Sequence, residues 1–112
     1  MTFDEAVHLI LSESEDKNGL IVKLRDNEPP TEQKVQLLLL ALRTVFDELR
    51  GKRLLDRTLA SGLFAIAFYS HAYAEHVRFK SGDGARFFEL LQFDIQFAVE
   101  SIFLDIWTCA QD

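Results

Sequence analysis

The chain contains 112 residues, of which 48% are apolar and 27% are charged, and it carries a formal net charge of -6. This composition indicates one globular domain over residues 1–112, and the acidic balance argues against general binding of nucleic acid or of a membrane surface. The only cysteine, Cys109, excludes an intrachain disulfide and a multi-cysteine zinc site, and no basic segment followed by an apolar core opens the chain; we therefore expect a cytoplasmic location.

The first expected element is a helix that begins after Thr2. Thr2 and Glu5 have the spacing of a capping box, in which each residue hydrogen-bonds the other's backbone. The helix should end in the charged turn 12–19, where Asn18 and Gly19 favour a reversal. Apolar residues recur on one face of this helix, namely Phe3, Ala6, Val7, Ile10 and Leu11.

The next segment, residues 20–25, is too short for its pattern to decide its structure. Its run LIVKLR fits a short strand, a helical turn or an extended arm equally well. Pro29 and Pro30 end the segment in each case. We therefore allow for a short extended segment here.

A second helix is predicted from Thr31, the N-cap, to Arg50, with Gly51 just beyond its end. One face is apolar and the opposite face is polar, as expected for a helix on the surface of a core. The apolar stripe consists of Val35, Leu38, Leu39, Leu42, Val45, Phe46 and Leu49.

A third helix is predicted over about residues 54–79. Between Leu59 and Tyr69 it is apolar at almost every angle, which predicts a central helix contacted on all sides. The uncharged run 59–74 falls short of the roughly 20 apolar residues that span a bilayer, so we expect no membrane insertion.

The fourth predicted helix starts at Asp83 as N-cap and runs to about Cys109. It has two apolar sectors, and one neighbouring helix cannot cover both. The second sector could meet another chain or the first helix of the same chain. The broad sector contains Phe87, Leu91, Ile95, Ala98, Val99 and Ile102, and the second contains Phe93, Phe97 and Leu104.

Together these elements predict an all-α fold, a small antiparallel bundle of three long helices plus a short N-terminal helix. The chain also holds 10 Phe, 2 Tyr and 1 Trp, a large aromatic content for a small monomer to bury. We therefore expect a homodimer, with an interface that includes Phe93, Phe97, Leu104 and Trp107.

A second group of residues suggests a small-ligand site or an enzyme. His71 and Glu75 are stacked one turn apart on the third helix, and an antiparallel turn would bring Asp94 level with His71. An imidazole beside a carboxylate can act as a base, but it is also a common structural pair. This cluster beside a phenylalanine-lined pocket is the alternative to a noncatalytic role.

A basic group lies around the turn between the second and third helices: Arg50, Lys52, Arg53 and Arg57. It could contact an anion or an acidic protein partner, or it could be solvated at the helix ends. Glu5 and His8 form the one Glu-x-x-His pair, half of what a di-metal bundle requires, and we predict no metal or other cofactor. The sequence favours a small cytoplasmic interaction protein without evident catalysis.

Overall fold

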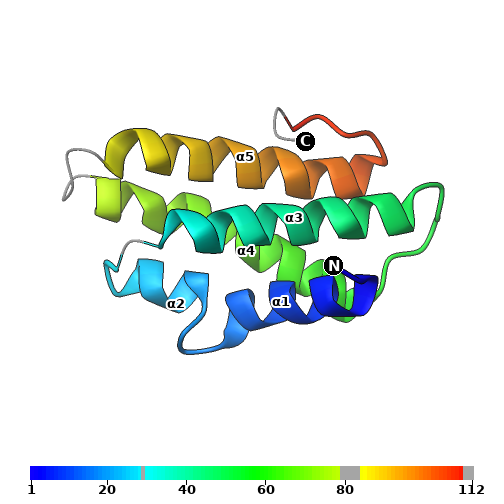
Figure 1. The fold of residues 1–112 in the computed structure, drawn as a ribbon, viewed down its shortest axis with the longest axis horizontal. Helices are drawn as coiled ribbons and strands as arrows, with labels where there is room; N and C mark the ends of the chain where they lie inside the picture. Colours follow the sequence, from blue (N-terminus) through cyan, green and yellow to red (C-terminus); the bar gives the residue numbers. More distant parts are fainter. Residues whose placement is uncertain (29, 79–83, 110–112) are drawn as a thin grey trace.

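The computed structural model describes residues 1–28, 30–78 and 84–109, with side chains described for 1–28, 30–73 and 93–109. The described chain is an all-α bundle without strands, as the sequence predicts (Figure 1). Its helices are α1 (Phe3–Glu15), α2 (Leu20–Arg25), α3 (Glu32–Leu49), α4 (Arg57–Arg78) and α5 (Gly84–Leu104).

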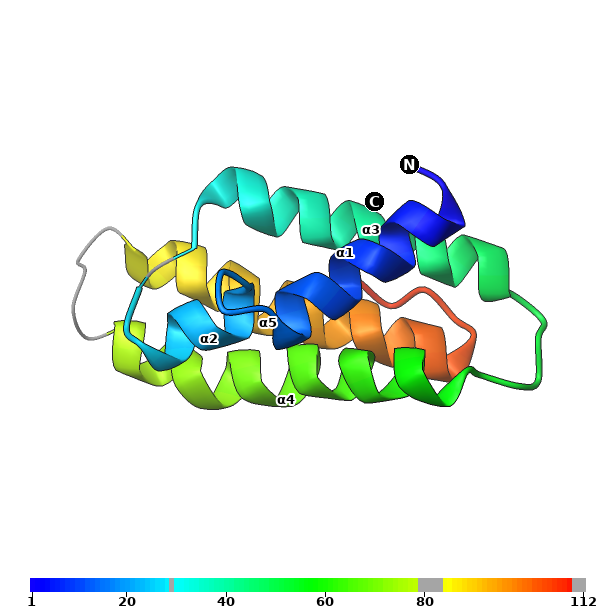
Figure 2. The same ribbon diagram turned by 90° about the horizontal axis from the view of Figure 1, so that it is seen from below.

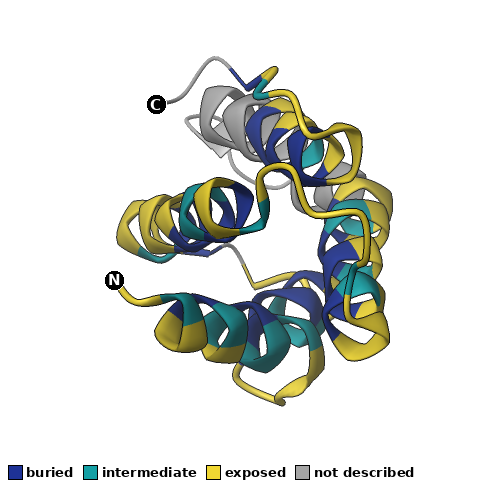
Figure 3. Cartoon of the chain, turned by 90° about the vertical axis from the view of Figure 1, so that its right-hand side faces the viewer, coloured by how far each residue is buried: buried dark blue, intermediate teal, exposed yellow. Residues whose placement is uncertain are grey.

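The helices form a four-sided bundle around one core. Going around it, α1 and α2 together make one side, followed by α3, α5 and α4, which packs back against both α1 and α2. Figure 3 looks along the bundle and shows buried residues facing inward from all four sides. Within the described residues, α1 makes no contact with α5 because the two lie diagonally across the core.

Local capping chemistry fixes the beginning of α1. The Glu5 N–H donates to Thr2 Oγ1 at 3.1 Å, and the Thr2 N–H donates to Glu5 Oε1 at 3.3 Å, which completes the predicted capping box. Hydrogen bonding from the Thr2 side chain, and then from its backbone, holds the pKa of Glu5 below its ordinary value.

The segment 20–25 is the short helix α2 rather than an extended arm. Leu20, Ile21 and Leu24 are buried, and the helical spacing places them on one side of α2. The helix α2 packs against α1 and α4 (Figure 2). The turn before it requires Gly19, because a Cβ there would lie 2.6 to 2.9 Å from three backbone carbonyl oxygens. Burial against the neighbouring helices therefore determines that this segment is helical, which its short apolar pattern alone did not.

The predicted limits of α3 are confirmed. Thr31 Oγ1 accepts a hydrogen bond from the Lys34 N–H at 3.1 Å, and the helix begins at the next residue, Glu32. At the other end, Gly51 has a φ of 76°, the left-handed conformation that glycine adopts without strain.

Both long C-terminal helices are shorter than predicted. The helix α4 begins at Arg57 rather than near residue 54, because the Asp56 carboxylate accepts the Leu59 N–H at 2.9 Å. The helix α5 ends at Leu104 rather than near Cys109, because Asp105 takes a φ of 61° and turns the chain back. The predicted N-cap Asp83 lies outside the described residues.

The expectation that the segment from Leu59 to Tyr69 is contacted on all sides is wrong. Leu63 and Ile66 are fully buried, but Phe64 is 58% and Phe68 is 53% exposed. Every side of a four-sided bundle has an outer face, and α4 occupies one side rather than the centre. Within the described residues, no helix combines the length and apolar character needed to cross a membrane.

Candidate protein-contact surface

The outer side of α5 exposes three large apolar residues. Ile95, Ala98 and Ile102 face the core, whereas Phe93, Phe97 and Leu104 are 59%, 41% and 55% exposed. At 3.6 residues per turn, these three exposed residues fall within about 40° of one another and opposite the core. The second sector seen in the sequence is therefore left uncovered by the described chain, including α1.

The outer side of α4 carries two more exposed phenylalanines. Phe64 and Phe68 are one turn apart, and their rings stack with centroids 5.4 Å apart and an interplanar angle of 11°. Both lie opposite the buried Ile66 on the helical wheel. The side chains of Phe64 and Phe68 thus point outward.

These two outer sides adjoin one another, because α4 and α5 are antiparallel neighbours in contact. The side-chain amide of Gln96 donates to the Ala67 carbonyl, which sets their register. In this register, and with a rise of 1.5 Å per residue, the exposed phenylalanines come alternately from α5 and α4, and successive ones are about 3 Å apart along the bundle axis. We call the resulting surface the aromatic face; its residues are Phe64, Phe68, Phe93, Phe97 and Leu104.

The aromatic face is comparable in area with the largest apolar patch on a typical monomer. A phenylalanine side chain offers roughly 200 Å² of surface, so with 41% to 59% of each phenylalanine exposed the face presents about 500 Å² of apolar area. The largest apolar patch on a typical monomer covers roughly 300 to 600 Å², and patches of this size often mark contact sites.

Trp107, the fourth interface residue expected from the sequence, lies elsewhere. Its ring packs against Phe46 of α3 with centroids 5.2 Å apart, and the Arg43 guanidinium lies 4.5 Å from its centroid. The chain reverses at Asp105, and the Thr108 N–H donates to Ser101 Oγ at 2.8 Å, which holds the returning segment against α5. Trp107 therefore faces α3 and not the aromatic face.

The structure describes the side chains of two of the three residues in the predicted ligand cluster. His71 is exposed on α4, whereas Asp94 is only 7% exposed on α5. Glu75 lies in α4, but its side chain is outside the described residues. Neither His71 nor Asp94 lines either of the two described pockets.

All four residues of the predicted basic group are exposed. The Arg50 guanidinium lies 5.6 Å from the ring centroid of Phe46, and Arg57 begins α4. Lys52 and Arg53 line a pocket at the end of the bundle, between the loop 50–56 and the end of α5.

Sequence reasoning found the α5 half of the aromatic face and missed the α4 half. The signal that could have found it is the pair of phenylalanines one turn apart, Phe64 and Phe68, which lie opposite Ile66 on the helical wheel. Since the whole segment is apolar, this pair did not stand out.

Compared with models of protein families, with curated proteins and with solved structures, the chain shows no significant match to any of them. We therefore classify the protein from its own structure, as an all-α antiparallel bundle with an exposed aromatic face.

Proposed function

We propose that the protein is a small interaction protein that works as a homodimer, with the aromatic face as its interface. It has an accessory or adaptor role in the cytoplasm, with no catalysis evident. The single observation that carries this proposal is the exposed aromatic face across α4 and α5.

The size of the aromatic face supports a second protein as its occupant. A stable interface buries about 800 Å² on each partner, of which about 60% is apolar. That fraction amounts to about 500 Å², close to the apolar area that the aromatic face presents. Burial against another protein removes this area from water.

Symmetry supports a second copy as that partner. In a twofold interface the same patch meets itself, so the patch must be self-complementary. A row of phenylalanines meets this condition because offset aromatic rings attract one another. Charged residues would repel their own copies, so Glu100, which α5 exposes between Phe97 and Leu104, must lie away from the twofold axis of such an interface.

The test compares the oligomeric state of Phe97→Asp and Phe93→Asp with that of the unmodified protein. Sedimentation equilibrium over a range of concentrations should give a dimer for the unmodified chain and monomers for both variants. Because both side chains are exposed, the far-ultraviolet circular dichroism of each variant should remain helical.

Leu40→Asp is the matched control, since Leu40 is an exposed apolar residue on α3, 51% exposed and away from the aromatic face. This variant should remain dimeric. A strictly monomeric unmodified protein at high concentration would contradict the proposal. So would dimers of unchanged affinity in both phenylalanine variants.

A further inference from the structure

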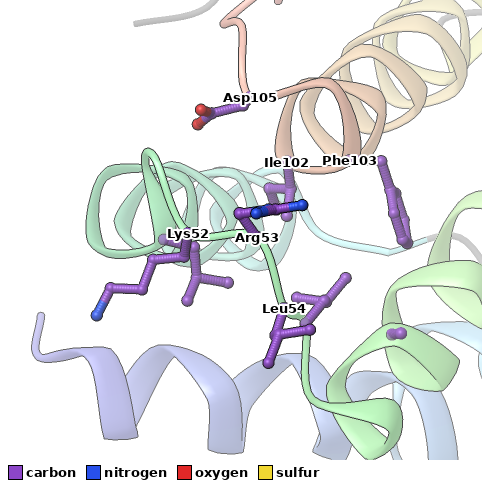
Figure 4. Close-up of a pocket in the computed structure, with 9 residues that line it drawn as sticks. Lys52, Arg53, Leu54, Ile102, Phe103 and Asp105 are labelled. Carbon is purple, nitrogen blue, oxygen red and sulfur yellow. The ribbon is translucent and has the colours of Figure 1, made fainter.

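A pocket of about 340 Å³ lies at the end of the bundle where the α3–α4 loop passes beneath the end of α5 (Figure 4). The pocket combines an apolar lining with a few polar groups, as small-molecule sites do. Its apolar lining comes from four different parts of the chain and consists of Leu49, Leu54, Leu55, Ala60, Ile102 and Phe103.

Hydrogen bonds hold the walls of this pocket in place. The Gly51 N–H donates to both carboxylate oxygens of Asp105, at 3.1 and 3.0 Å, and so joins the loop to the end of α5. The Lys52 N–H donates to the Leu49 carbonyl at 3.0 Å. Asp56 caps α4 on the opposite wall. The pocket is therefore largely preformed, which lowers the entropy that a ligand must overcome.

Arg53 is the cation directed across this pocket. In Figure 4 its side chain extends between Ile102 and Leu54, whereas the amino group of Lys52 points away. Within the described part of the chain, Arg53 takes part in no ion pair, while Lys23, Arg25, Lys34 and Arg43 each have a carboxylate partner. Asp105 is already engaged by the Gly51 N–H.

We propose that this pocket binds a small organic carboxylate, with Arg53 holding the carboxylate group and the apolar lining holding a short hydrocarbon body. The planar guanidinium presents paired N–H donors that match the two oxygens of a carboxylate. The volume lies near the lower end of the range for ligand pockets, so the ligand is small. With a net charge of -6, the protein as a whole repels anions, and binding must depend on this local contact.

Three probes distinguish recognition of the carboxylate group from recognition of the hydrocarbon chain. Octanoate carries both the carboxylate and the apolar chain, acetate carries the carboxylate alone, and 1-octanol carries the chain with a neutral group. Isothermal titration calorimetry of the full chain should give saturable binding of octanoate that is much tighter than that of either other probe. Octanoate should also raise the melting temperature, and above its dissociation constant the rise should continue with the logarithm of the octanoate concentration.

The variant Arg53→Gln should weaken octanoate binding about tenfold to a hundredfold, because a hydrogen bond to a charged group is lost. Arg57→Gln is the matched control, since Arg57 is an exposed cation nearby that does not line the pocket. It should bind octanoate as the unmodified protein does. Circular dichroism checks that both variants are folded.

The proposal is overturned if octanoate does not bind saturably, or if Arg53→Gln binds it with unchanged affinity. Equal affinity for acetate would show that charge alone is recognised. Equal affinity for 1-octanol would show that the carboxylate is not recognised. The pocket shares no residue with the aromatic face, so Phe97→Asp should retain octanoate binding whatever its oligomeric state.

Discussion

The ion pair between Glu13 and Lys34 ties the end of α1 to the start of α3. Lys34 Nζ lies 3.3 Å from Glu13 Oε1 and also donates to the Asn18 carbonyl at 2.8 Å. The Glu13 side chain is only 7% exposed, whereas that of Lys34 is 29% exposed. This arrangement makes the two partners unequal, because a mutation that removes the lysine leaves a buried carboxylate behind.

The perturbation is Lys34→Met, which keeps an unbranched side chain and removes the cation. Removing one partner of a fully buried pair costs about 3 to 5 kcal/mol. Since Lys34 is partly exposed and water can reach Glu13 once the lysine is gone, we expect a loss of roughly 2 kcal/mol in the free energy of unfolding. Glu13→Gln combined with Lys34→Met should restore roughly 1 kcal/mol or more, because the neutral amide removes the buried charge.

The assay is equilibrium unfolding in urea of the unmodified chain, the two single variants and the double variant, at one protein concentration. Lys23→Met is the control, since Lys23 pairs with Glu28, whose side chain is 60% exposed, and such surface pairs contribute less than about 1 kcal/mol. The reasoning fails if Lys34→Met is no more destabilising than Lys23→Met, or if the double variant is no more stable than Lys34→Met.

Two further predictions concern turns and the C-terminal segment. Gly19→Ala should lower the free energy of unfolding by about 2 to 3 kcal/mol, since its Cβ would contact backbone carbonyls, whereas Gly51→Ala, in open space at a φ of 76°, should lower it by about 1 kcal/mol. If thermal unfolding shows that the two glycine variants lose the same free energy of unfolding, this reasoning is contradicted. Trp107→Ala should cost about 2 kcal/mol, because it removes the contacts with Phe46 and Arg43. In the unmodified protein the single tryptophan reports on the same contact, and its fluorescence should change together with the circular dichroism during unfolding.

Elements whose ends depend on local chemistry were predictable from the sequence. The caps at Thr2 and Thr31 and the left-handed Gly51 are interactions within a few residues, and each is where the sequence places it. The end of α5 was not predictable in this way. It depends on the conformation of Asp105 and on the hydrogen bond between Thr108 and Ser101, which a periodic apolar pattern does not contain.

The same limit explains the partial prediction of the candidate interface. Phe93, Phe97 and Leu104 stand apart from the core sector of α5 because polar bands separate the two sectors in the sequence. In α4 no polar band marks the outer side, so the exposure of Phe64 and Phe68 depends on which helices lie beside it. A helix that continued to Cys109 would carry Trp107 on α5, whereas the chain turns back after Leu104 and carries the Trp107 ring to α3.

The diagonal arrangement of α1 and α5 gives the strongest reason for a partner. The sequence left open whether α1 covers the second sector of α5, but α1 lies across the core and cannot reach it. Burying about 500 Å² of exposed apolar area would contribute about 12 kcal/mol of hydrophobic free energy per copy. Association costs an estimated 4 to 15 kcal/mol or more in lost translational and rotational freedom and further free energy in side-chain ordering. Two copies that each bury half of the aromatic face gain about 12 kcal/mol, which lies in the upper half of that range, so the dimer depends on how closely the two rows of rings fit.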